Sequence, residues 1–298
     1  MTKAPEILCV GSVLWDVIGR SASAMRQGSD VPGRITRGPG GVALNIAMAL
    51  ARFGLRPALL SAVGRDGEGD ELVVACISLG LGTEYLYRSD DLPTDVYMAI
   101  EGANGLIAAI ADAHSLEAAG DKILRPLMDG RLGTAQTPFA GTVALDGNLT
   151  QALLEHIATA PALARADLRV APASPGKAER LQPFLTHPRA VLYVNLEEAG
   201  LLAQTRFDDS ASAADALVKR GAARVLVTDG GRPASEAAQT APTISHAPAP
   251  VLMTRVTGAG DTFMAAHIAA ELDGAPRAQA LIRALEAAAR YVSGETIP

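Results

Sequence analysis

The chain has 298 residues, of which 49% are hydrophobic and 19% are charged, and its formal net charge at pH 7 is −6. A composition this apolar excludes a disordered or low-complexity protein. The acidic balance and the lack of a lysine- and arginine-rich block argue against binding to nucleic acid or to an anionic membrane surface. The length suits one large domain or two unequal ones.

The two cysteines, Cys9 and Cys76, are too few for a disulfide framework and form no CxxC metal pair. The amino terminus lacks the long apolar core of a signal peptide, and no run approaches 18 uninterrupted apolar residues. We therefore expect a soluble protein of the reducing cytoplasm, without a membrane anchor.

Strands and helices alternate over the first eighty residues. The apolar runs at 6–11 and 58–64 predict buried strands. Residues 42–53 carry apolar side chains at helical spacing and are followed by Gly54, while residues 68–80 predict a second helix that ends in glycine. This alternation favours a parallel sheet.

The stretch 96–111 interrupts that alternation, because two apolar arms flank the pair Asn104-Gly105. An Asn-Gly pair in this setting predicts a β-hairpin with a type I′ turn, in which both turn residues have positive φ. Together with the polar, glycine-containing segment before residue 40, the hairpin predicts a small sheet that projects from the main domain as a lid. The lid segments are about 14–39 and 94–113.

From residue 142 onward, apolar runs end repeatedly in polar residues. The four strand-to-loop segments are TVALDGN at 142–148, DLRVAPAS at 167–174, AVLYVNLEEAG at 190–200 and RVLVTDGG at 224–231. Helix-like stretches separate them, and residues 260–292 are helical and alanine-rich. An open α/β sheet binds its ligand beyond the carboxyl ends of its strands, so these polar residues are site candidates.

The segment Gly258-Ala259-Gly260-Asp261 runs directly into the last helical region. Two glycines allow successive backbone N–H groups to turn toward one point, and the helix adds its positive amino-terminal end, which suits a phosphate or a developing oxyanion. Asp261 then lies where a carboxylate can accept a proton from an attacking hydroxyl. The structural alternative is a glycine turn followed by an Asp helix cap.

Three motifs together resemble one known family. TGAGDTF at 257–263 resembles the carboxy-terminal signature of the ribokinase-like (PfkB) carbohydrate and nucleoside kinases, and GGVALNIAMALARFG at 40–54 resembles their amino-terminal signature. Residues 195–198 fit the family's Asn-x-x-Glu motif. The resemblance implies a single domain over 1–298, an α/β three-layer sandwich with a mostly parallel central sheet and a small β-sheet lid.

The resemblance also implies in-line transfer of the γ-phosphoryl group of ATP, with Mg²⁺, to a primary hydroxyl of a small sugar or nucleoside. Asp261 matches the catalytic base, and the 258–260 loop matches the anion hole. Four residues match those that bind the nucleotide and organise Mg²⁺, water and phosphate: Asn195, Glu198, Thr228 and Gly230. Glu198 is expected to act through water. The structural alternative for Asn195 and Glu198 is a helix start with acidic residues that interact favourably with the helix dipole. The alternative for Thr228 and Gly230 is an ordinary turn at the end of a strand.

On the acceptor side, Asp16 resembles the family's carboxylate that holds substrate hydroxyls. The pair Gly40 and Gly41 permits close backbone approach to the sugar, and Asn45 offers both a donor and an acceptor. Bridging between elements is the structural alternative for Asn45. Trp15 is expected in the core rather than as a stacking platform.

Two positions depart from the family pattern. Arg255 stands where an Asp is common, and Ala266 stands where a glycine is usual. A guanidinium beside a polyphosphate site bears on nucleotide and cation handling, so dependence on a monovalent cation stays open. Arg255 is also the one feature that favours a catalytically silent sugar- or nucleoside-binding protein on the same scaffold.

The acceptor is suggested by a subgroup resemblance. Residues 94–112, with the sequence AIAD at their end, resemble the hairpin region of the pseudouridine kinases, as do LDGNLTQALL and APASPGKAERL, although Ala171 replaces the subgroup's Asp. This implies phosphorylation of pseudouridine at its 5′-hydroxyl, with Asn104 and Asp112 as base-side or lid contacts. Asn104 is equally a turn residue, and a ribokinase or an adenosine kinase is the alternative.

The sequence also bears on assembly and on other enzyme classes. In this family an exposed lid sheet often pairs with that of a second subunit, and the apolar arms of the hairpin suit such pairing, so we expect a homodimer. The chain has no P-loop motif GxxxxGK[ST] and no HExxH or HxH spacing, which argues against a P-loop kinase and a metal-dependent hydrolase.

Overall fold

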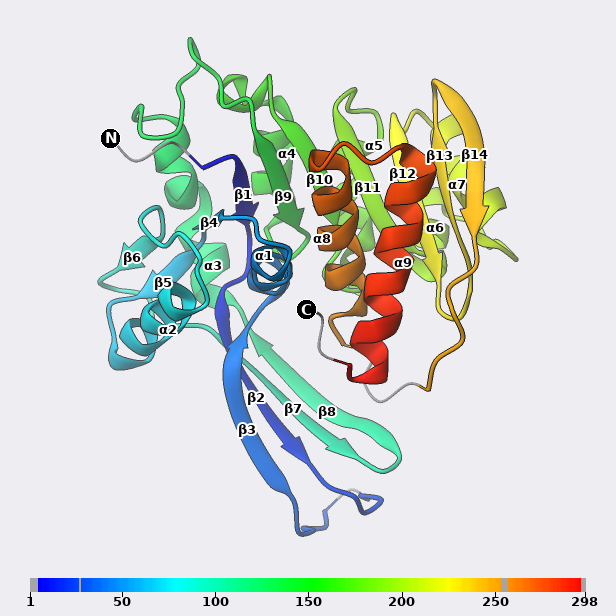
Figure 1. Ribbon diagram of the computed structural model, residues 1–298. Coiled ribbons are helices and arrows are strands. Elements are labelled where there is room, and N and C mark those ends of the chain that lie inside the picture. Colours follow the sequence, from blue (N-terminus) through cyan, green and yellow to red (C-terminus); the bar gives the residue numbers. More distant parts are fainter. Residues whose placement is uncertain (1–4, 27, 253–256, 296–298) are drawn as a thin grey trace.

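The computed structural model describes residues 5–26, 28–252 and 257–295 (Figure 1). Its centre is an eight-stranded sheet with helices on both faces. In spatial order the strands are β14 (Ala241–His246), β13 (Arg232–Ala238), β12 (Arg224–Asp229), β11 (Ala190–Asn195), β10 (Asp167–Ala171), β9 (Thr142–Asp146), β1 (Ile7–Val10) and β4 (Pro57–Leu60). Strands β12 to β4 in this order pair in parallel, and only β13 and β14 pair antiparallel. The predicted α/β fold with a mostly parallel sheet is confirmed.

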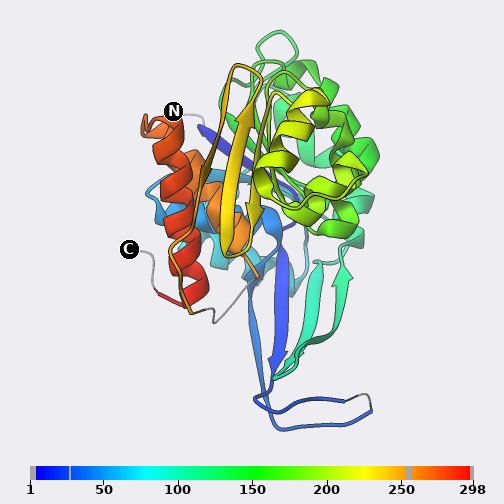
Figure 2. The ribbon, with the colours of Figure 1, turned by 90° about the vertical axis from the view of Figure 1, so that its right-hand side faces the viewer.

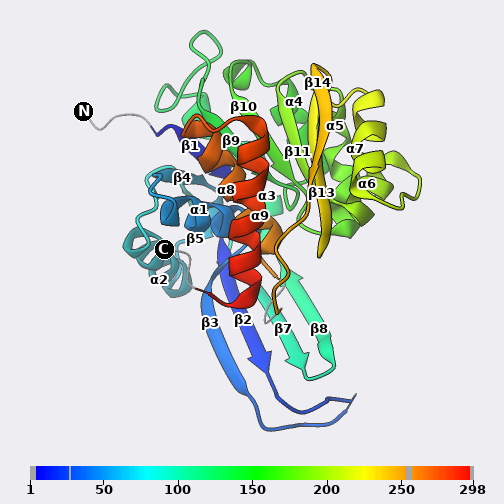
Figure 3. The same ribbon diagram turned by 45° about the vertical axis from the view of Figure 1, so that its right-hand side comes forward.

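Side chains of β1 explain the layers, because successive residues of a strand point to opposite faces. Ile7 and Cys9 pack on one face with α1 (Val42–Arg52), α8 (Ala259–Leu272) and α9 (Arg277–Ser293) (Figure 3). Leu8 and Val10 pack into the core on the other face. The helices there are α3 (His114–Ala119), α4 (Gln151–Thr159), α5 (Gln182–Leu185), α6 (Leu196–Ala203) and α7 (Ser210–Lys219), with the 3₁₀ helices η1 (Gly120–Leu127), η2 (Pro161–Leu163) and η3 (Pro175–Leu181). Within the described ranges, none of the helices has the length and apolar character needed to cross a bilayer.

A second, four-stranded sheet projects beyond the carboxyl ends of the parallel strands (Figure 2). Its order is β3 (Arg34–Gly40), β2 (Leu14–Arg20), β7 (Val96–Gly102) and β8 (Gly105–Asp112). Helix α2 (Gly67–Ser78) lies beside it, and the short strands β5 (Ala62–Gly64) and β6 (Tyr87–Ser89) form a two-stranded sheet. Trp15 is buried as expected, with Arg37 stacked 3.7 Å from its ring centre.

Two local predictions were wrong. Residues 58–64 do not form one strand: the chain leaves the main sheet at Ser61, and its two halves, β4 and β5, pair with different partners. The predicted hairpin is present, but its turn is not type I′. Gly105 has a φ of 95°, whereas Asn104 is not among the described non-glycine residues with positive φ. The Asn104 side chain instead bonds to the backbone of Met25, donating to its O and accepting from its N, both at 3.1 Å.

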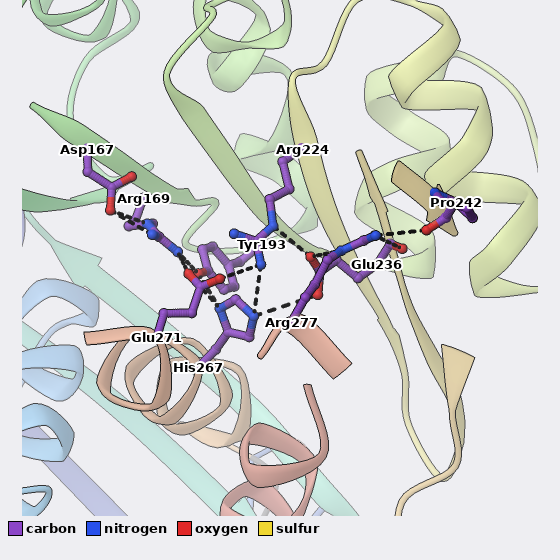
Figure 4. A network of polar contacts seen from close by, with 9 residues as sticks. All are labelled: Asp167, Arg169, Tyr193, Arg224, Glu236, Pro242, His267, Glu271 and Arg277. Carbon is purple, nitrogen blue, oxygen red and sulfur yellow. Dashed lines mark hydrogen bonds and ion pairs between the residues drawn. The ribbon is translucent and has the colours of Figure 1, made fainter. Parts of the chain in front are cut away.

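A buried polar network ties α8 and α9 to the main sheet (Figure 4). Its central side chains are Arg169, Tyr193, Arg224, Glu236, His267, Glu271 and Arg277. Tyr193 Oη lies 2.8 Å from His267 Nδ1, and Glu271 pairs with Arg169 and Arg224 at 2.5 Å each. Since His267 and Glu271 belong to the helix that begins beside Asp261, the network fixes that helix against β10, β11 and β12.

Candidate functional site

Asp261 lies in the first turn of α8, directly after the glycine-containing loop. Gly258 is the helix N-cap with a φ of 89°, and a Cβ there would lie 2.5 Å from Tyr291 Oη, so only glycine fits. The first backbone hydrogen bond of the helix runs from Thr262 N to Gly258 O. The N–H groups of Ala259, Gly260 and Asp261 therefore have no acceptor within the helix, which makes this turn suitable for an anion.

The Asp261 carboxylate lies in an acidic environment. Burial is the largest effect on its pKa, which is raised to about 7. The charges of Asp146, Asp16 and Glu198 also raise the pKa. The hydrogen bond that Asn45 Nδ2 donates to Oδ2, at 3.1 Å, lowers it. A carboxyl group with a pKa near neutrality can accept and release a proton at physiological pH. Of the predicted residues, Asn45 thus contacts Asp261 directly, and Asp16 and Glu198 lie near enough for their charges to act on it.

Asp16 projects from β2 against the glycine pair. A Cβ on Gly40 would lie 2.1 Å from the Asp16 carboxyl group, and a Cβ on Gly41, whose φ is 97°, would lie 2.5 Å from Ser12 O. The two glycines therefore leave room for Asp16 and for the loop that contains Ser12. Burial raises the pKa of Asp16 to about 6.

Asp146 is the last residue of β9, at the centre of this edge; sequence analysis counted it only among the polar residues that end the apolar runs and gave it no role. Its side chain is fully buried, and Oδ2 accepts from Ser12 N at 2.8 Å, Ser12 Oγ at 2.5 Å and Ala43 N at 3.2 Å. Oδ1 accepts from Asn148 N at 2.7 Å. Asp146 thereby joins the loop after β1 to the start of α1. The signal that points to it is its place at the end of an apolar run.

Asn195 and Glu198 form a capping box at the start of α6. Asn195 Oδ1 accepts from Glu198 N at 2.9 Å, and Glu198 Oε2 accepts from Asn195 N at 2.8 Å. Burial raises the pKa of Glu198 to about 7, against the lowering effect of the Asn195 hydrogen bond. Across the described ranges, no group of three or more His, Cys, Asp and Glu side chains is arranged to hold a metal ion.

Thr228 and Gly230 line a cavity of about 440 Å³ beside the start of α8. Ala259 and Gly260 line it as well, so the cavity opens next to the anion-binding turn. Most of the remaining wall is apolar, formed by residues that include Val251, Phe263, Leu285 and Ala288. Phe263 belongs to the 257–263 motif, but sequence analysis gave it no role. It missed Val251, Leu285 and Ala288, since they come from separate segments and carry no motif.

Asn104 and Asp112 are not brought to this site together. They lie at opposite ends of β8, roughly 24 Å apart at the usual rise of an extended strand. The Asp112 carboxylate accepts a hydrogen bond from His114 Nδ1 at 2.7 Å. In the sheet register Asp112 lies opposite Val96, whereas Asp16 lies opposite Tyr97. Because neighbouring residues of a strand point to opposite faces, Asp112 belongs to the face of the small sheet opposite to that of Asp16. Asn104 lies at the far tip of the hairpin.

The two departures from the family pattern have different outcomes. Ala266 is buried in α8 and belongs to the core beneath α1. Arg255 lies outside the described residues, so the structure gives no account of it.

Comparison with known proteins identifies the family of the chain. Residues 4–295 match the pfkB family carbohydrate kinase. The chain is 26% identical over 288 residues to a pseudouridine kinase of Escherichia coli (strain K12), covering 94% of this chain and 88% of that protein. It is also 26% identical over 276 residues to a ribokinase of Mus musculus, covering 89% and 81%. The structure of Arabidopsis thaliana ribokinase complexed with ribose and ATP has the same fold, with a TM-score of 0.79 at 20% identity, and covers 99% of this chain and 95% of that one. This chain belongs to the PfkB family of carbohydrate kinases.

Proposed function

We propose that the protein transfers the γ-phosphoryl group of ATP, bound with Mg²⁺, to the 5′-hydroxyl of a nucleoside, with pseudouridine as the acceptor. The observation that carries the proposal is the position of Asp261: it follows Ala259 and Gly260, which line the 440 Å³ cavity, and it lies near enough to Asp16 for that carboxylate to raise its pKa. The two cysteines of the protein, Cys9 and Cys76, are buried and form no disulfide, which favours a reducing compartment such as the cytoplasm.

In this reaction Asp261 accepts the proton of the acceptor hydroxyl as its oxygen attacks the γ-phosphorus. The bond between that phosphorus and the β,γ-bridging oxygen breaks, and ADP leaves. The N–H groups of Ala259 and Gly260 stabilise the negative charge on the transferred group. Phosphoryl transfer depends mainly on positioning and on charge stabilisation, and the start of α8 supplies both.

The nucleotide fits the cavity by its chemistry. The apolar wall that includes Phe263 and Leu285 suits a purine ring, while Thr228 and Gly230 lie toward the end where the phosphates meet α8. Mg²⁺ enters with ATP, and it prefers phosphate oxygens, waters and one or two carboxylates over an all-protein cage. Glu198 is the carboxylate that we propose to reach it through water, beside Asn195.

The acceptor sugar lies over Asp16, Asn45 and the Gly40–Gly41 turn in this proposal. A carboxylate accepts from two neighbouring hydroxyls, and the Asn45 amide both donates and accepts. The choice of pseudouridine is supported by the bacterial pseudouridine kinase, whose match covers 94% of this chain. The mouse ribokinase is equally identical, so ribose is the alternative acceptor.

We also propose that the four-stranded sheet closes over the acceptor and pairs with that of a second copy. Met98 and Ile110 lie opposite each other on neighbouring strands, and their side chains are 48% and 69% exposed. Ile35, which is 79% exposed, lies opposite Gly19, and Gly19 lies on the same face of β2 as Val17, the partner of Met98. Ile35 therefore extends the same apolar face onto β3. Because Asp16 faces the other side, this apolar face is available for a second subunit.

The test is release of ADP by the purified protein with ATP and Mg²⁺ and one acceptor at a time: pseudouridine, uridine, adenosine, ribose or fructose. We expect turnover with pseudouridine that is lost in Asp261→Asn. Turnover with another acceptor would keep the kinase and change the substrate. A folded protein that binds ATP and phosphorylates none of the five would contradict the proposal and favour a binding protein.

A further inference from the structure

Lys177 is a half-buried cation that the proposed mechanism does not use. It lies in η3, the 3₁₀ helix that follows β10, and its Nζ donates a hydrogen bond to Asn148 Oδ1. Over the described ranges, no carboxylate comes within ion-pairing distance of this amine. An ammonium group has three donors and no acceptor. One neutral amide oxygen therefore leaves donors of Lys177 for another partner.

The surroundings make this lysine unusual. Burial lowers its pKa, while the Asp146 charge nearby acts in the opposite direction. Asp146 is already occupied by donors from Ser12, Ala43 and Asn148. A partly buried charge without an ion-pair partner is costly, and a ligand oxygen would lower that cost.

Arg180, one turn further along η3, provides the contrast. Its Nη1 donates to Asn148 O at 3.2 Å and to Leu149 O at 3.1 Å, and it lies 3.7 Å from Glu117 Oε1. Its guanidinium is thus directed to the protein itself. Two cations of the same short segment therefore differ in whether the protein satisfies them.

Lys177 follows β10, which lies between β9 and β11, and its hydrogen bond to Asn148 directs its amine to the β9 side, the acceptor half of the site. The 440 Å³ cavity lies at the end of β12, whereas Asn148 follows β9, which is next to β1. Asn148 Nδ2 donates to Ser12 Oγ at 3.0 Å, and Ser12 Oγ accepts from Val42 N at 2.9 Å, at the start of α1. Asp16 and Gly41 belong to this same edge.

We propose that Lys177 is a specificity-determining residue that donates a hydrogen bond to a carbonyl oxygen on the base of a nucleoside acceptor. This inference rests on the proposed function. Asp16 and Asn45 already match the hydroxyls of the sugar. A carbonyl oxygen only accepts hydrogen bonds and an ammonium only donates them, so the two are complementary. The acceptor class is then a nucleoside whose ring carries carbonyl groups, in preference to a free pentose.

The experiment compares kcat/KM for pseudouridine and for ribose in the wild type and in Lys177→Met. A hydrogen bond to a charged group corresponds to about a 10- to 100-fold effect. We expect a fall of this size for pseudouridine and a change of less than about 3-fold for ribose, with the KM for ATP unchanged. Lys219→Met, which removes an exposed charge at the end of α7, is the control and should match the wild type.

Equal losses with both acceptors, or no loss with pseudouridine, would overturn the role of Lys177. A wild-type protein that phosphorylates ribose but no nucleoside would also overturn the role of Lys177, while the proposed kinase activity would stand. If Lys177→Met does not fold, Lys177→Gln and calorimetric binding of pseudouridine without ATP provide the same comparison. Absence of turnover with every acceptor in the wild type would instead be a failure of the proposed function.

Discussion

Asn45 Nδ2 lies 3.1 Å from Asp261 Oδ2 and joins the first turns of two helices that are 216 residues apart in sequence. The amide stabilises the ionised carboxylate, because it donates to an oxygen that is a better acceptor when it is charged. Burial and three neighbouring carboxylates act in the opposite sense. The balance keeps the pKa of Asp261 near 7, where a general base is most effective.

Replacing Asp261 by Asn should abolish most of the activity without unfolding the protein. Loss of a general base typically lowers kcat by about 10²- to 10⁴-fold. The measurement is ADP release at saturating ATP, with circular dichroism to verify the fold. Asp273→Asn, at the other end of α8 where the carboxylate pairs with Arg283 at 3.0 Å, is the matched control and should stay active. Near-normal turnover of Asp261→Asn would refute the assignment.

The pH profile should follow the same carboxyl group. Asp261 must be ionised to accept a proton, so kcat/KM should rise with pH through about 7 and level off above it. Asn45→Ala removes a donor that lowers the pKa, and the acidic limb should therefore move to higher pH. A profile that is flat between pH 6 and 8 in the wild type, or a limb that moves to lower pH in the variant, would contradict this account.

Elements that carry their own local signal were predictable from the sequence. β1 is buried on both faces, so it is a continuous apolar run, and α1 has apolar residues at helical spacing with Gly54, at φ 80°, just after its end. The turn before Asp261 needs glycine at Gly258, which makes it visible as a motif.

Features that depend on contacts distant in sequence were not predictable. β14 pairs along one edge but contains Pro, Thr, Ser and His, so it has no strand-like apolar run. The partners of Asp146 come from the loop after β1 and from α1, more than 100 residues away. The same holds for the network around His267, whose arginines and carboxylates resemble surface charges in the sequence.

Glu236 should make a large contribution to stability. Burial alone would raise its pKa, but His267, Arg224 and Arg277 lower it to about 2. Because the folded-state pKa lies below the unfolded value, the stabilisation is present above about pH 4.5 and is lost as the pH falls toward 2. Glu236→Gln should cost about 3–5 kcal/mol in the free energy of unfolding at pH 7, since it removes the buried carboxylate that pairs with Arg277 and leaves Arg224 with Glu271 alone.

Urea unfolding of wild type and Glu236→Gln between pH 7 and pH 3 measures this effect, and the difference should shrink at the acidic end. Glu286→Gln, on the exposed side of α9, is the matched control with little expected change. A difference that stays constant down to pH 3, or grows there, would mean that the Glu236 charge is not the cause.

The apolar face of the small sheet should hold two copies together. Ile110 is 69% exposed opposite Met98, and burying both against a second subunit removes apolar surface from water. Sedimentation velocity at micromolar concentration should give a dimer for the wild type. Ile110→Arg should give a monomer, because an unpaired charge would be buried in the contact. Ile77→Arg, at a 57% exposed position of α2, should stay dimeric. A wild type that is monomeric at high micromolar concentration would contradict the pairing, and the exposed isoleucines of β3 and β8 would then need another partner.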